Sequence, residues 1–460
     1  MNGSAIAALK ASLGAERARD DMATRSLYAH DDTPQNCMPA AVLFPHSHTE
    51  VQAIVRLARR HGLALVPRGA GSGNVGGALP VPGSAVISFE CMSRILDYRP
   101  EDRTITVESG CITAQVDAHV SPDGLCYPPD PGSSPYCRIG GNLAMNAGGP
   151  HAIKYGVTRD YVLGLRAVTG TGETLVTGVR TSKGVVGYDL TRLLVGSEGT
   201  LALITEATLR LVPRPESRAL LRAAFRDGPT ACQAVSRIMT QRVIPSAVEF
   251  MDSHALAAVR QMGAAQELPP DTGALLMVEM DGDRAGIPEQ MAALSGALRG
   301  EGLLQMEEAQ DTEQAALLWM ARKALSPATK AMAPLKINED VVVPVSRLPD
   351  LLSFIDLLAR EEKIRIVSFG HAGNGNLHVN FLVNPGHPEE MEKVRRALER
   401  LLRKVLSLGG TISGEHGIGS VKREFVPLEL DTVSLNLQKS IRKLFDPDWI
   451  LNPGKLFPDS

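Results

Sequence analysis

The stretch PRGAGSGNVGGALP, residues 67–80, decides what kind of fold this chain can adopt. Its G-x-G-x-x-G spacing over residues 71–76 formally matches the dinucleotide-binding fingerprint, which requires a helix of several turns directly after the glycines. Here Pro80, Pro82 and Gly83 follow at once, before a β-rich run, AVISFE. No amphipathic helix fits between them, so the loop is not a Rossmann turn. Successive glycines still let backbone N–H groups converge on an anion, so we expect a pyrophosphate nest, with a merely flexible loop as the alternative.

The residues before this loop predict a helix and then a short buried strand. Ser47 and Glu50 form a capping-box pattern, apolar residues recur at helical spacing after them, and Gly62 follows the last turn. We expect the helix over residues 48–61 and the strand over residues 63–66. The glycine-rich loop is therefore delivered by an ordered helix–strand unit.

Two further glycine-rich loops follow among short β-rich segments. They are PPDPGSSPYCRIGGNLAMNAGG, residues 128–149, and LLVGSEGT, residues 193–200. Three such loops between strands predict one long ligand threaded through an α+β domain. The composition changes after Pro213 and Pro215, and residues 216–425 alternate between strands and helices as a second domain.

Length and composition exclude several classes of protein. A chain of 460 residues is too long for one ordinary domain. A formal charge of -3 and 4% aromatic residues argue against a nucleic-acid partner. No run approaches the ~18 apolar residues of a membrane span, and the N-terminus lacks the apolar core of a signal peptide. The six cysteines form no C-x-x-C pair, so we expect neither a zinc ribbon nor an iron–sulfur cluster. These features favour a cytoplasmic protein, or one bound peripherally at the inner face of a membrane.

The clearest chemical signal is a set of histidines and acids in two short motifs, HAGNGNLH and SGEHGIG. His371 and His378 bracket a tight turn between strands, and strand alternation puts Asn380 on the His378 face. Glu415 and His416 follow on a glycine loop. Two histidines and one carboxylate are a common three-ligand set for a divalent metal with an open position. Purely structural histidines are the alternative.

A second group of charges is Arg322, Lys323 and Lys336. Arg322 ends a predicted helix, so it either caps that helix, lies on a solvated face, or has a functional role.

Six motifs in order carry a family resemblance: the three glycine loops, the two histidine motifs and FDPDWILNPGK at the C-terminus. Over nearly its whole length the chain resembles the FAD-linked dehydrogenases of the vanillyl-alcohol oxidase/para-cresol methylhydroxylase superfamily. It is most similar to the D-2-hydroxy-acid branch, which oxidises glycolate, D-lactate or D-2-hydroxyglutarate. The resemblance implies an α+β fold: an N-terminal segment (1–37), an FAD-binding domain (38–215), a substrate and metal domain with an antiparallel sheet (216–425), and a C-terminal strap (426–460) returning to the flavin.

The resemblance also implies roles for individual residues. Implied FAD contacts are Arg68, Gly69, Gly71, Ser72, Gly73, Asn74, Gly76, Pro129, Asp130, Ser133, Gly140, Gly141, Asn142, Gly149, Glu198, Gly199, Ile204 and Asn452. Implied ligands of a divalent metal, zinc or manganese, are His371, His378 and Glu415. His416 would be the catalytic base, Arg322 and Lys336 would bind the substrate carboxylate, and Asn380 would lie beside the substrate.

The implied reaction removes a proton from the hydroxyl and a hydride from C2 of a 2-hydroxy acid. The metal would act as a Lewis acid, an imidazole can take the proton near neutral pH, and FAD accepts the hydride. Electrons would leave to a separate acceptor, a quinone, a cytochrome or an electron-transfer flavoprotein, and the chain would be a homodimer or a subunit of a larger complex. The alternatives are a catalytically silent flavin-binding subunit, which has no need of the His and Glu set, and a metallohydrolase, which leaves the glycine loops unexplained.

Two departures from the family pattern are informative. Some relatives attach FAD covalently through a His in the first glycine loop, but this loop has no His or Cys, so we expect dissociable FAD. Many relatives carry Asp where this chain has Asn374, which removes one negative charge near the expected metal site.

Overall fold

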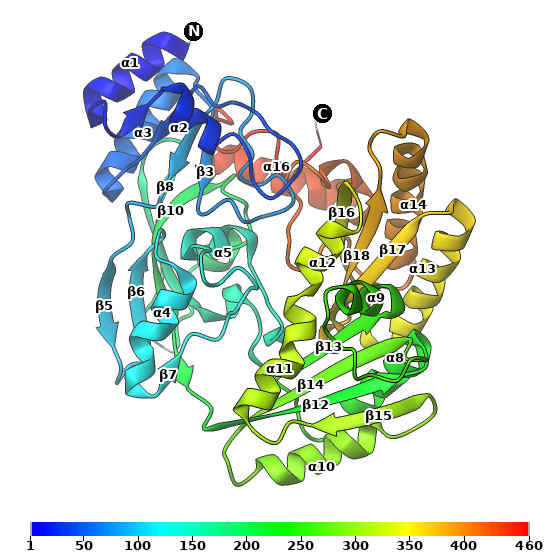
Figure 1. Cartoon of the computed structure of the whole chain (residues 1–460). Helices are drawn as coiled ribbons and strands as arrows, with labels where there is room; N and C mark the ends of the chain where they lie inside the picture. Colours follow the sequence, from blue (N-terminus) through cyan, green and yellow to red (C-terminus); the bar gives the residue numbers. More distant parts are fainter. Residues whose placement is uncertain (1, 182, 459–460) are drawn as a thin grey trace. The chain divides into compact units, whose positions relative to one another are not determined.

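The computed structural model describes residues 2–181 and 183–458, which form two compact units (Figure 1). Unit 1 contains the chain up to Gly149, Gly156–Arg214 and the chain from Glu415 onward. Unit 2 contains Pro150–Tyr155 and Pro215–Gly414. Each unit is therefore assembled from segments that are distant in sequence.

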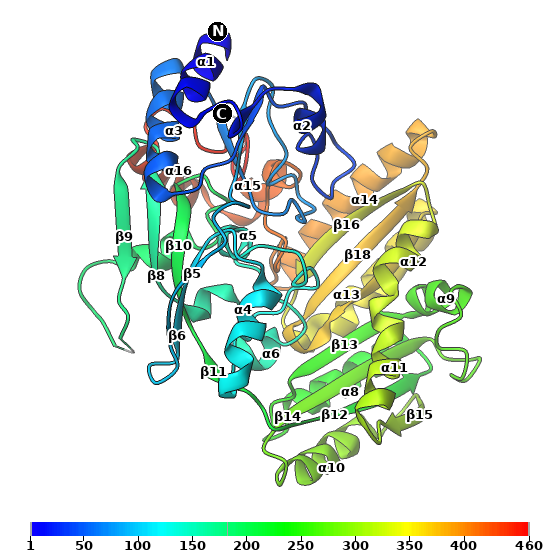
Figure 2. The same ribbon diagram turned by 60° about the vertical axis from the view of Figure 1, so that its left-hand side comes forward.

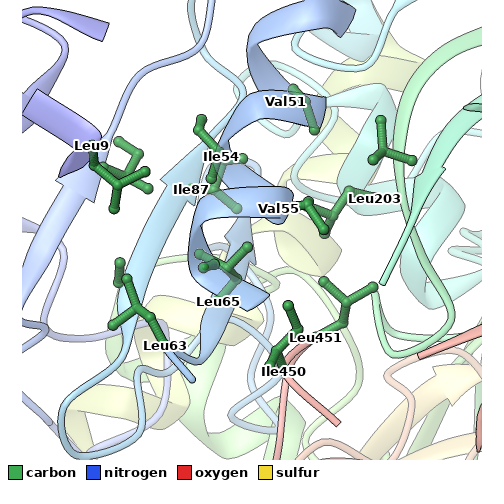
Figure 3. Packing of buried hydrophobic residues seen from close by; sticks show 14 of the residues in the cluster. Leu9, Val51, Ile54, Val55, Leu63, Leu65, Ile87, Leu203, Ile450 and Leu451 are labelled. Carbon is green, nitrogen blue, oxygen red and sulfur yellow. The ribbon is translucent and has the colours of Figure 1, made fainter. Parts of the chain in front are cut away.

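The first part of unit 1 is a small sheet with strand order β1-β2-β4-β3, in which β2, β4 and β3 are parallel. The strands are β1 (Ala18–Arg19), β2 (Ala41–Leu43), β4 (Ala85–Ser88) and β3 (Leu65–Arg68). The helices α1 (Asn2–Leu13) and α3 (His48–His61) share one apolar core with this sheet, in which Leu9, Ile54, Val55, Leu65 and Ile87 pack together (Figure 3). The predicted helix over 48–61 is confirmed.

The ends of α3 explain where the next strand begins. Ser47 accepts the N–H of Glu50, and Gly62 closes the helix in the left-handed conformation with a φ of 61°. The N–H of Leu63 then bonds to the carbonyl of Ala58 at 2.8 Å, which satisfies a free carbonyl of the last helical turn. The predicted strand over 63–66 was therefore placed too early, because Leu63 still serves the helix end and β3 begins at Leu65.

The second part of unit 1 is an antiparallel sheet of five strands. In spatial order the strands are β5 (Ile95–Arg99), β6 (Thr104–Glu108), β10 (Ala202–Arg210), β8 (Val162–Thr169) and β9 (Thr174–Gly178). The shorter elements of this unit are α2 (Met22–Leu27), α4 (Thr113–Val120), β7 (Leu125–Cys126), α5 (Ile139–Met145), α7 (Leu190–Leu194), β11 (Val212–Pro213) and α15 (Val426–Glu429).

The C-terminal part of the chain returns to the first sheet. After α16 (Thr432–Phe445) the chain runs through turns and bends, and Leu451 forms an isolated parallel bridge with Leu65 of β3. Asp446 holds the first turn, because its carboxylate accepts the N–H groups of Ile450 and Leu451. The segment belongs to unit 1, but the prediction that it is extended is wrong, because Trp449, Asn452 and Leu456 have positive φ values that turn the chain.

Unit 2 is built on an antiparallel sheet of seven strands, ordered β15-β12-β14-β13-β17-β18-β16 (Figure 2). In that order they are Leu303–Glu308, Ser217–Phe225, Ala274–Gly282, Ala247–Asp252, Arg365–His371, Asn376–Val383 and Leu335–Val342. Helices α9 (Ser253–Gln261), α11 (Thr312–Lys323) and α12 (Leu325–Ala331) share an apolar core with one face of the sheet. The other face is covered by α8 (Gly228–Met239), α10 (Ile287–Leu298), α13 (Leu348–Glu362) and α14 (Pro388–Ser407). The predicted α+β class is confirmed.

Among the helices that the structure describes, none has the length and apolar character needed to cross a membrane.

Candidate active site

The first glycine loop of unit 1 runs from β3 to β4 with no helix between them. Gly71 and Gly76 have φ values of 72° and 77°, a region that favours glycine. A Cβ on Gly71 would lie 2.2 Å from Arg68 Nη2, and one on Gly76 would lie 2.1 Å from Ser420 Oγ. A Cβ on Gly73 would meet nothing within 4 Å. Two glycines are thus required by the protein's own packing, while the third faces open space.

Arg68 supports the base of this loop. Its side chain is buried, Nη1 donates to the carbonyl of His30 at 2.6 Å, and the guanidinium lies 5.4 Å from the ring centroid of Tyr28. Burial lowers the pKa of Arg68, an effect that nearby Asp31 opposes. The guanidinium holds the N-terminal segment against the loop.

The second glycine loop, residues 128–149, is equally tight. A Cβ on Gly140 would lie 2.8 Å from Ser109 Cβ, and Gly149 has a φ of 146° with Asp130 O only 2.6 Å from its ideal Cβ. The side chain of Asn142 is buried and donates to Thr113 Oγ1 at 2.7 Å. Gly141, like Gly73, faces open space.

Glu198 and Asn452 tie the third loop to the rest of unit 1. Glu198 has a φ of 54°, and its carboxylate accepts the N–H groups of Ile418 and Gly419 at 2.7 and 2.8 Å. Asn452 Nδ2 donates to the carbonyls of Glu198 and Gly77 at 2.7 and 3.0 Å. Burial raises the pKa of Glu198, which the two backbone N–H groups oppose. The glycine loops and the C-terminal strap therefore converge through these two side chains.

The remaining implied FAD contacts lie on the same loops, except Ile204, which lies on β10. Pro129 and Ile204 are buried, Ser133 accepts two backbone N–H groups within its own turn, and Gly199 has a φ of 68° with Pro67 Cγ 2.5 Å from its ideal Cβ. Gly69 would place a Cβ 3.5 Å from Arg138 Cβ. Direct contact of these residues with a flavin stays a prediction.

Unit 1 has the polar character that a dinucleotide needs. Several buried polar atoms lack a hydrogen-bond partner among the described residues: Asp31 Oδ2, Ser109 Oγ, Arg138 Nε, Ser420 Oγ and Asn452 Oδ1. Unsatisfied buried groups are costly, so a ligand that bonds to them stabilises the unit. With the open space at Gly73 and Gly141, the residues present fit FAD.

In unit 2, His371 and His378 lie at the end of the β17–β18 hairpin. Their side chains are largely buried, and the ring centroids are 5.3 Å apart with the rings nearly perpendicular. Residues 372–374 make a single turn between the strands, and Gly375 closes it with a φ of 74°. Asn374 is exposed in this turn. The hairpin therefore brings the two predicted histidine ligands together.

Glu249 fixes the orientation of His371. It lies opposite His371 in the β13–β17 register, is fully buried, and its Oε1 is 2.6 Å from His371 Nδ1. Its other oxygen accepts from Arg322 Nε at 2.6 Å. Burial alone would raise the pKa of Glu249, but His371 and Arg322 outweigh it and lower the pKa to about 2. With Nδ1 held by this carboxylate, Nε2 is the nitrogen of His371 that would bind a metal.

Asp340 is the buried carboxylate beside the second histidine, His378. It lies opposite His378 in the β16–β18 register, and its Oδ1 is 3.8 Å from His378 Nδ1. The same carboxylate accepts from Asn376 Nδ2 at 2.6 Å and from the N–H of Gly414 at 2.8 Å. Asp340 is fully buried, so it links the hairpin to the start of the SGEHGIG motif.

Glu415 and His416 directly follow Gly414 in the chain and begin the C-terminal part of unit 1. His371, His378 and Asp340 belong to unit 2, so a metal site shared by His371, His378 and Glu415 stays a prediction. The donor set of two imidazoles and a carboxylate suits zinc or manganese.

The predicted substrate residues occupy the same face of the sheet. Asn380 is fully buried, and its Nδ2 donates to the carbonyls of Val367 and His378, while Oδ1 has no partner among the described residues. Lys336 lies two residues from Asn338 on β16, and Asn338 is opposite Asn380.

Arg322 neither caps α11 nor lies on a solvated face. It pairs with Glu249, and its guanidinium lies 5.2 Å from the ring centroid of Phe369. Its other nitrogens make no hydrogen bond to the described residues. They remain available to an anion.

Sequence patterns missed Glu249 and Asp340. Each is a fully buried acidic residue within a predicted or observed strand, AVEFMD and KINEDVVV. A buried carboxylate requires a partner, so such a residue is itself a signal for a nearby histidine, arginine or metal.

Family models and known proteins match most of the chain. Residues 39–178 match the family model described as FAD binding domain, and residues 214–456 match that described as FAD linked oxidases, C-terminal domain. The chain is 39% identical to glycolate oxidase subunit GlcD of Bacillus subtilis over 445 residues, covering 96% of this chain and 94% of that protein.

Two more relatives are similar over most of their length. The identity is 34% to D-lactate dehydrogenase of Anaerostipes hadrus, covering 93% of this chain and 92% of that protein. It is also 34% to D-2-hydroxyglutarate dehydrogenase of Stutzerimonas stutzeri, covering 91% of each. Among solved structures, p-cresol methylhydroxylase superposes with a TM-score of 0.82 at 16% identity, covering 98% of this chain and 96% of that one. The predicted p-cresol methylhydroxylase type of fold is confirmed.

Proposed function

This chain belongs to the FAD-linked oxidoreductases of the glycolate oxidase, D-lactate dehydrogenase and D-2-hydroxyglutarate dehydrogenase group, and from that premise we propose that it oxidises a D-2-hydroxy acid to the 2-oxo acid with help from a divalent metal. The observation that carries the proposal is the buried Glu249 carboxylate, which holds His371 Nδ1 on one oxygen and Arg322 Nε on the other. One carboxylate thereby orients a metal ligand and a group that can grip an anion.

The protein's own residues divide the work of this reaction. FAD supplies the hydride acceptor, and a metal held by His371, His378 and Glu415 supplies Lewis acidity toward the hydroxyl. Arg322 binds the substrate carboxylate through its outer nitrogens, because Nε is already committed to Glu249.

The other polar residues complete the proposed chemistry. His416 takes the hydroxyl proton as general base. Lys336 adds a second positive charge on the same face, and the free Oδ1 of Asn380 can accept a hydrogen bond from the substrate.

Two features follow for the cofactors and the partner. FAD is bound without a covalent bond, since the first glycine loop has no His or Cys to form one. Electrons leave the reduced flavin to an external acceptor, a quinone, a cytochrome or an electron-transfer flavoprotein. The metal is zinc or manganese.

Anaerobic flavin reduction tests the proposal directly. The purified FAD-loaded protein, with zinc or manganese added, is mixed without oxygen with glycolate, D-lactate, D-2-hydroxyglutarate or D-malate, and the visible flavin band is followed. We expect at least one of these acids to bleach the band, and L-lactate to be much slower than D-lactate.

Matched variants show whether flavin reduction depends on the predicted metal ligands. His378→Ala should abolish bleaching, whereas His387→Ala, which changes an exposed histidine, should leave the rate unchanged. A band that no hydroxy acid bleaches, with FAD and metal both bound, would instead support a silent flavin-binding subunit.

A further inference from the structure

The segment Pro150–Tyr155 belongs to unit 2, although the residues on both sides of it belong to unit 1. It directly follows Gly149, the last residue of the second glycine loop, and contains the short helix α6 (Ala152–Tyr155). A loop of the FAD-binding region is therefore covalently continuous with a piece of the metal-binding unit.

Two buried carboxylates of β14 anchor this segment. Lys154 Nζ donates to Asp281 Oδ1 at 2.5 Å, and the hydroxyl of Tyr155 donates to Asp281 Oδ2 at 2.8 Å. His151 Nε2 lies 2.8 Å from Glu279 Oε1. Both acids are largely buried, Asp281 at 1% and Glu279 at 6% exposure, so the segment is fixed to the sheet at several points.

The same segment touches the turn that follows His371. A Cβ on Gly373 would lie 2.2 Å from Ile153 Cδ1, so Ile153 packs directly against this turn. Glu279 also connects this segment to α11, because its Oε2 accepts a hydrogen bond from Trp319 Nε1 at 3.2 Å. Trp319 lies one helical turn before Arg322 on α11.

The residues just before the segment touch the third metal ligand within unit 1. A Cβ on Gly148 would lie 2.7 Å from Glu415 Oε2, so the carboxylate rests against this glycine. Gly149 in turn packs against Asp130, a residue of the second glycine loop. Residues 148–153 thus contact Glu415 at one end, the His371 turn at the other, and a predicted FAD loop between them.

We propose that residues 148–155 couple FAD binding to metal binding, so that each ligand raises the affinity for the other. FAD fixes the conformation of the glycine loop, and this holds Gly148 against Glu415 and Ile153 against the turn after His371. Coupling between two binding sites is reciprocal and commonly amounts to about 5–150-fold in affinity. The inference rests on the proposed metal site and on FAD, but not on the identity of the substrate.

The test measures zinc affinity with and without FAD. Metal-free protein, as apoprotein and after reloading with FAD, is titrated with zinc in competition with a chromophoric chelator. In the wild type we expect FAD to raise zinc affinity about tenfold, within the usual range of such coupling. The ratio of zinc affinity with FAD to zinc affinity without FAD should approach one in two variants. These are Gly148→Ala, whose Cβ displaces the Glu415 carboxylate, and Ile153→Ala.

Three controls separate coupling from general destabilisation. Ile153→Leu keeps an apolar side chain of the same volume beside Gly373 and should keep most of the ratio of zinc affinities. Gly296→Ala adds a Cβ in α10 where nothing lies within 4 Å, and should match the wild type. Leu298→Ala removes a fully buried side chain of α10, so it should lower stability and leave the ratio intact.

Equal zinc affinity of apoprotein and FAD-loaded wild type would overturn the coupling. A wild-type ratio in both Gly148→Ala and Ile153→Ala would overturn the role of this segment. If zinc binding does not depend on His371 or His378, the proposed metal site fails and the coupling fails with it. If the ratio behaves as expected but no hydroxy acid reduces the flavin, the coupling stands and only the proposed reaction fails.

Discussion

Glu249 joins two functional groups through a single carboxylate, and its removal should affect both. In Glu249→Gln an amide replaces the carboxylate, so only one of the two donors, His371 Nδ1 or Arg322 Nε, still meets an oxygen. Loss of such a partner commonly costs about 10–100-fold in metal affinity. We therefore expect zinc affinity to fall by about that factor and the KM for the hydroxy acid to rise. Glu308→Gln, at an exposed position, is the matched control, and wild-type zinc affinity in Glu249→Gln would refute the orienting role.

His416 is the predicted proton acceptor, and its replacement should slow chemistry more than binding. General-base catalysis typically contributes about 10²–10⁴-fold, so His416→Ala should reduce the anaerobic rate of flavin reduction by roughly that factor. Substrate affinity should change less, because Arg322 and the metal would still bind the substrate. Rapid mixing over a range of substrate concentrations separates the two effects. An unchanged limiting rate would mean that another group takes the proton.

Single residues also show where sequence reasoning reaches its limit. His371 and His378 were predictable because they stand in one hairpin, seven residues apart, with glycines between them. Glu249 and Asp340 come from β13 and β16, and only the strand order of the sheet brings them to the hairpin. Neighbouring strands that are distant in sequence cannot be paired from one sequence alone, so these partners were out of reach.

The helix α3 is held to the five-stranded sheet of unit 1 by His48, which gives a pH-dependent stability. The buried ring contacts Thr205 Oγ1 through Nδ1 at 2.9 Å and Thr174 Oγ1 through Nε2 at 2.7 Å. Burial lowers the pKa of His48 below its usual value of 6.5, and nearby Arg166 adds to this effect. The neutral ring is therefore favoured in the folded protein. The contribution of His48 to the free energy of unfolding is complete above pH 6.5. It is lost as the pH falls through the lowered pKa of the ring.

Denaturant unfolding of apoprotein at pH 7.5 and pH 5 tests this contribution. We expect the wild type to lose more unfolding free energy between these pH values than His48→Gln, which does not titrate there. The reason is that protonation makes both ring nitrogens donors in a site built for one neutral tautomer. Equal losses in the two proteins would show that His48 does not control this dependence.

Elements with a strong local pattern were predictable to within a few residues. The α3 helix has its cap, its apolar stripe and its terminal glycine in the sequence, and β14 and β17 consist mostly of apolar residues. The start of β3 was missed because the N–H of Leu63 bonds back to the helix, a choice that sequence patterns do not reveal. The small parallel sheet was also not predicted, because its order depends on contacts between distant segments.

For the molecule as a whole, we predict that the flavin is not covalently attached, because the loops that would surround it lack an accessible His or Cys. The first glycine loop has no His or Cys, and Cys137 in the second loop is buried with its Sγ 3.3 Å from Thr113 Oγ1. His151 lies against Glu279 in unit 2. Acid precipitation should therefore release all of the yellow colour into the supernatant. Flavin that stays with the pellet after washing would contradict this prediction.

The pairing of Leu451 with Leu65 has a consequence for how the protein is made. Ribosomes release the chain from its N-terminus at about 5–20 residues per second, so β3 leaves the exit tunnel long before its last partner. During that interval the whole of Pro215–Gly414 is synthesised while one edge of β3 stays uncovered. A nascent chain stalled when Gly414 has just left the exit tunnel should already protect unit 2 from protease, yet its first sheet should remain open to chaperones. The first sheet of unit 1 is therefore synthesised first but is the last part of the protein to finish folding.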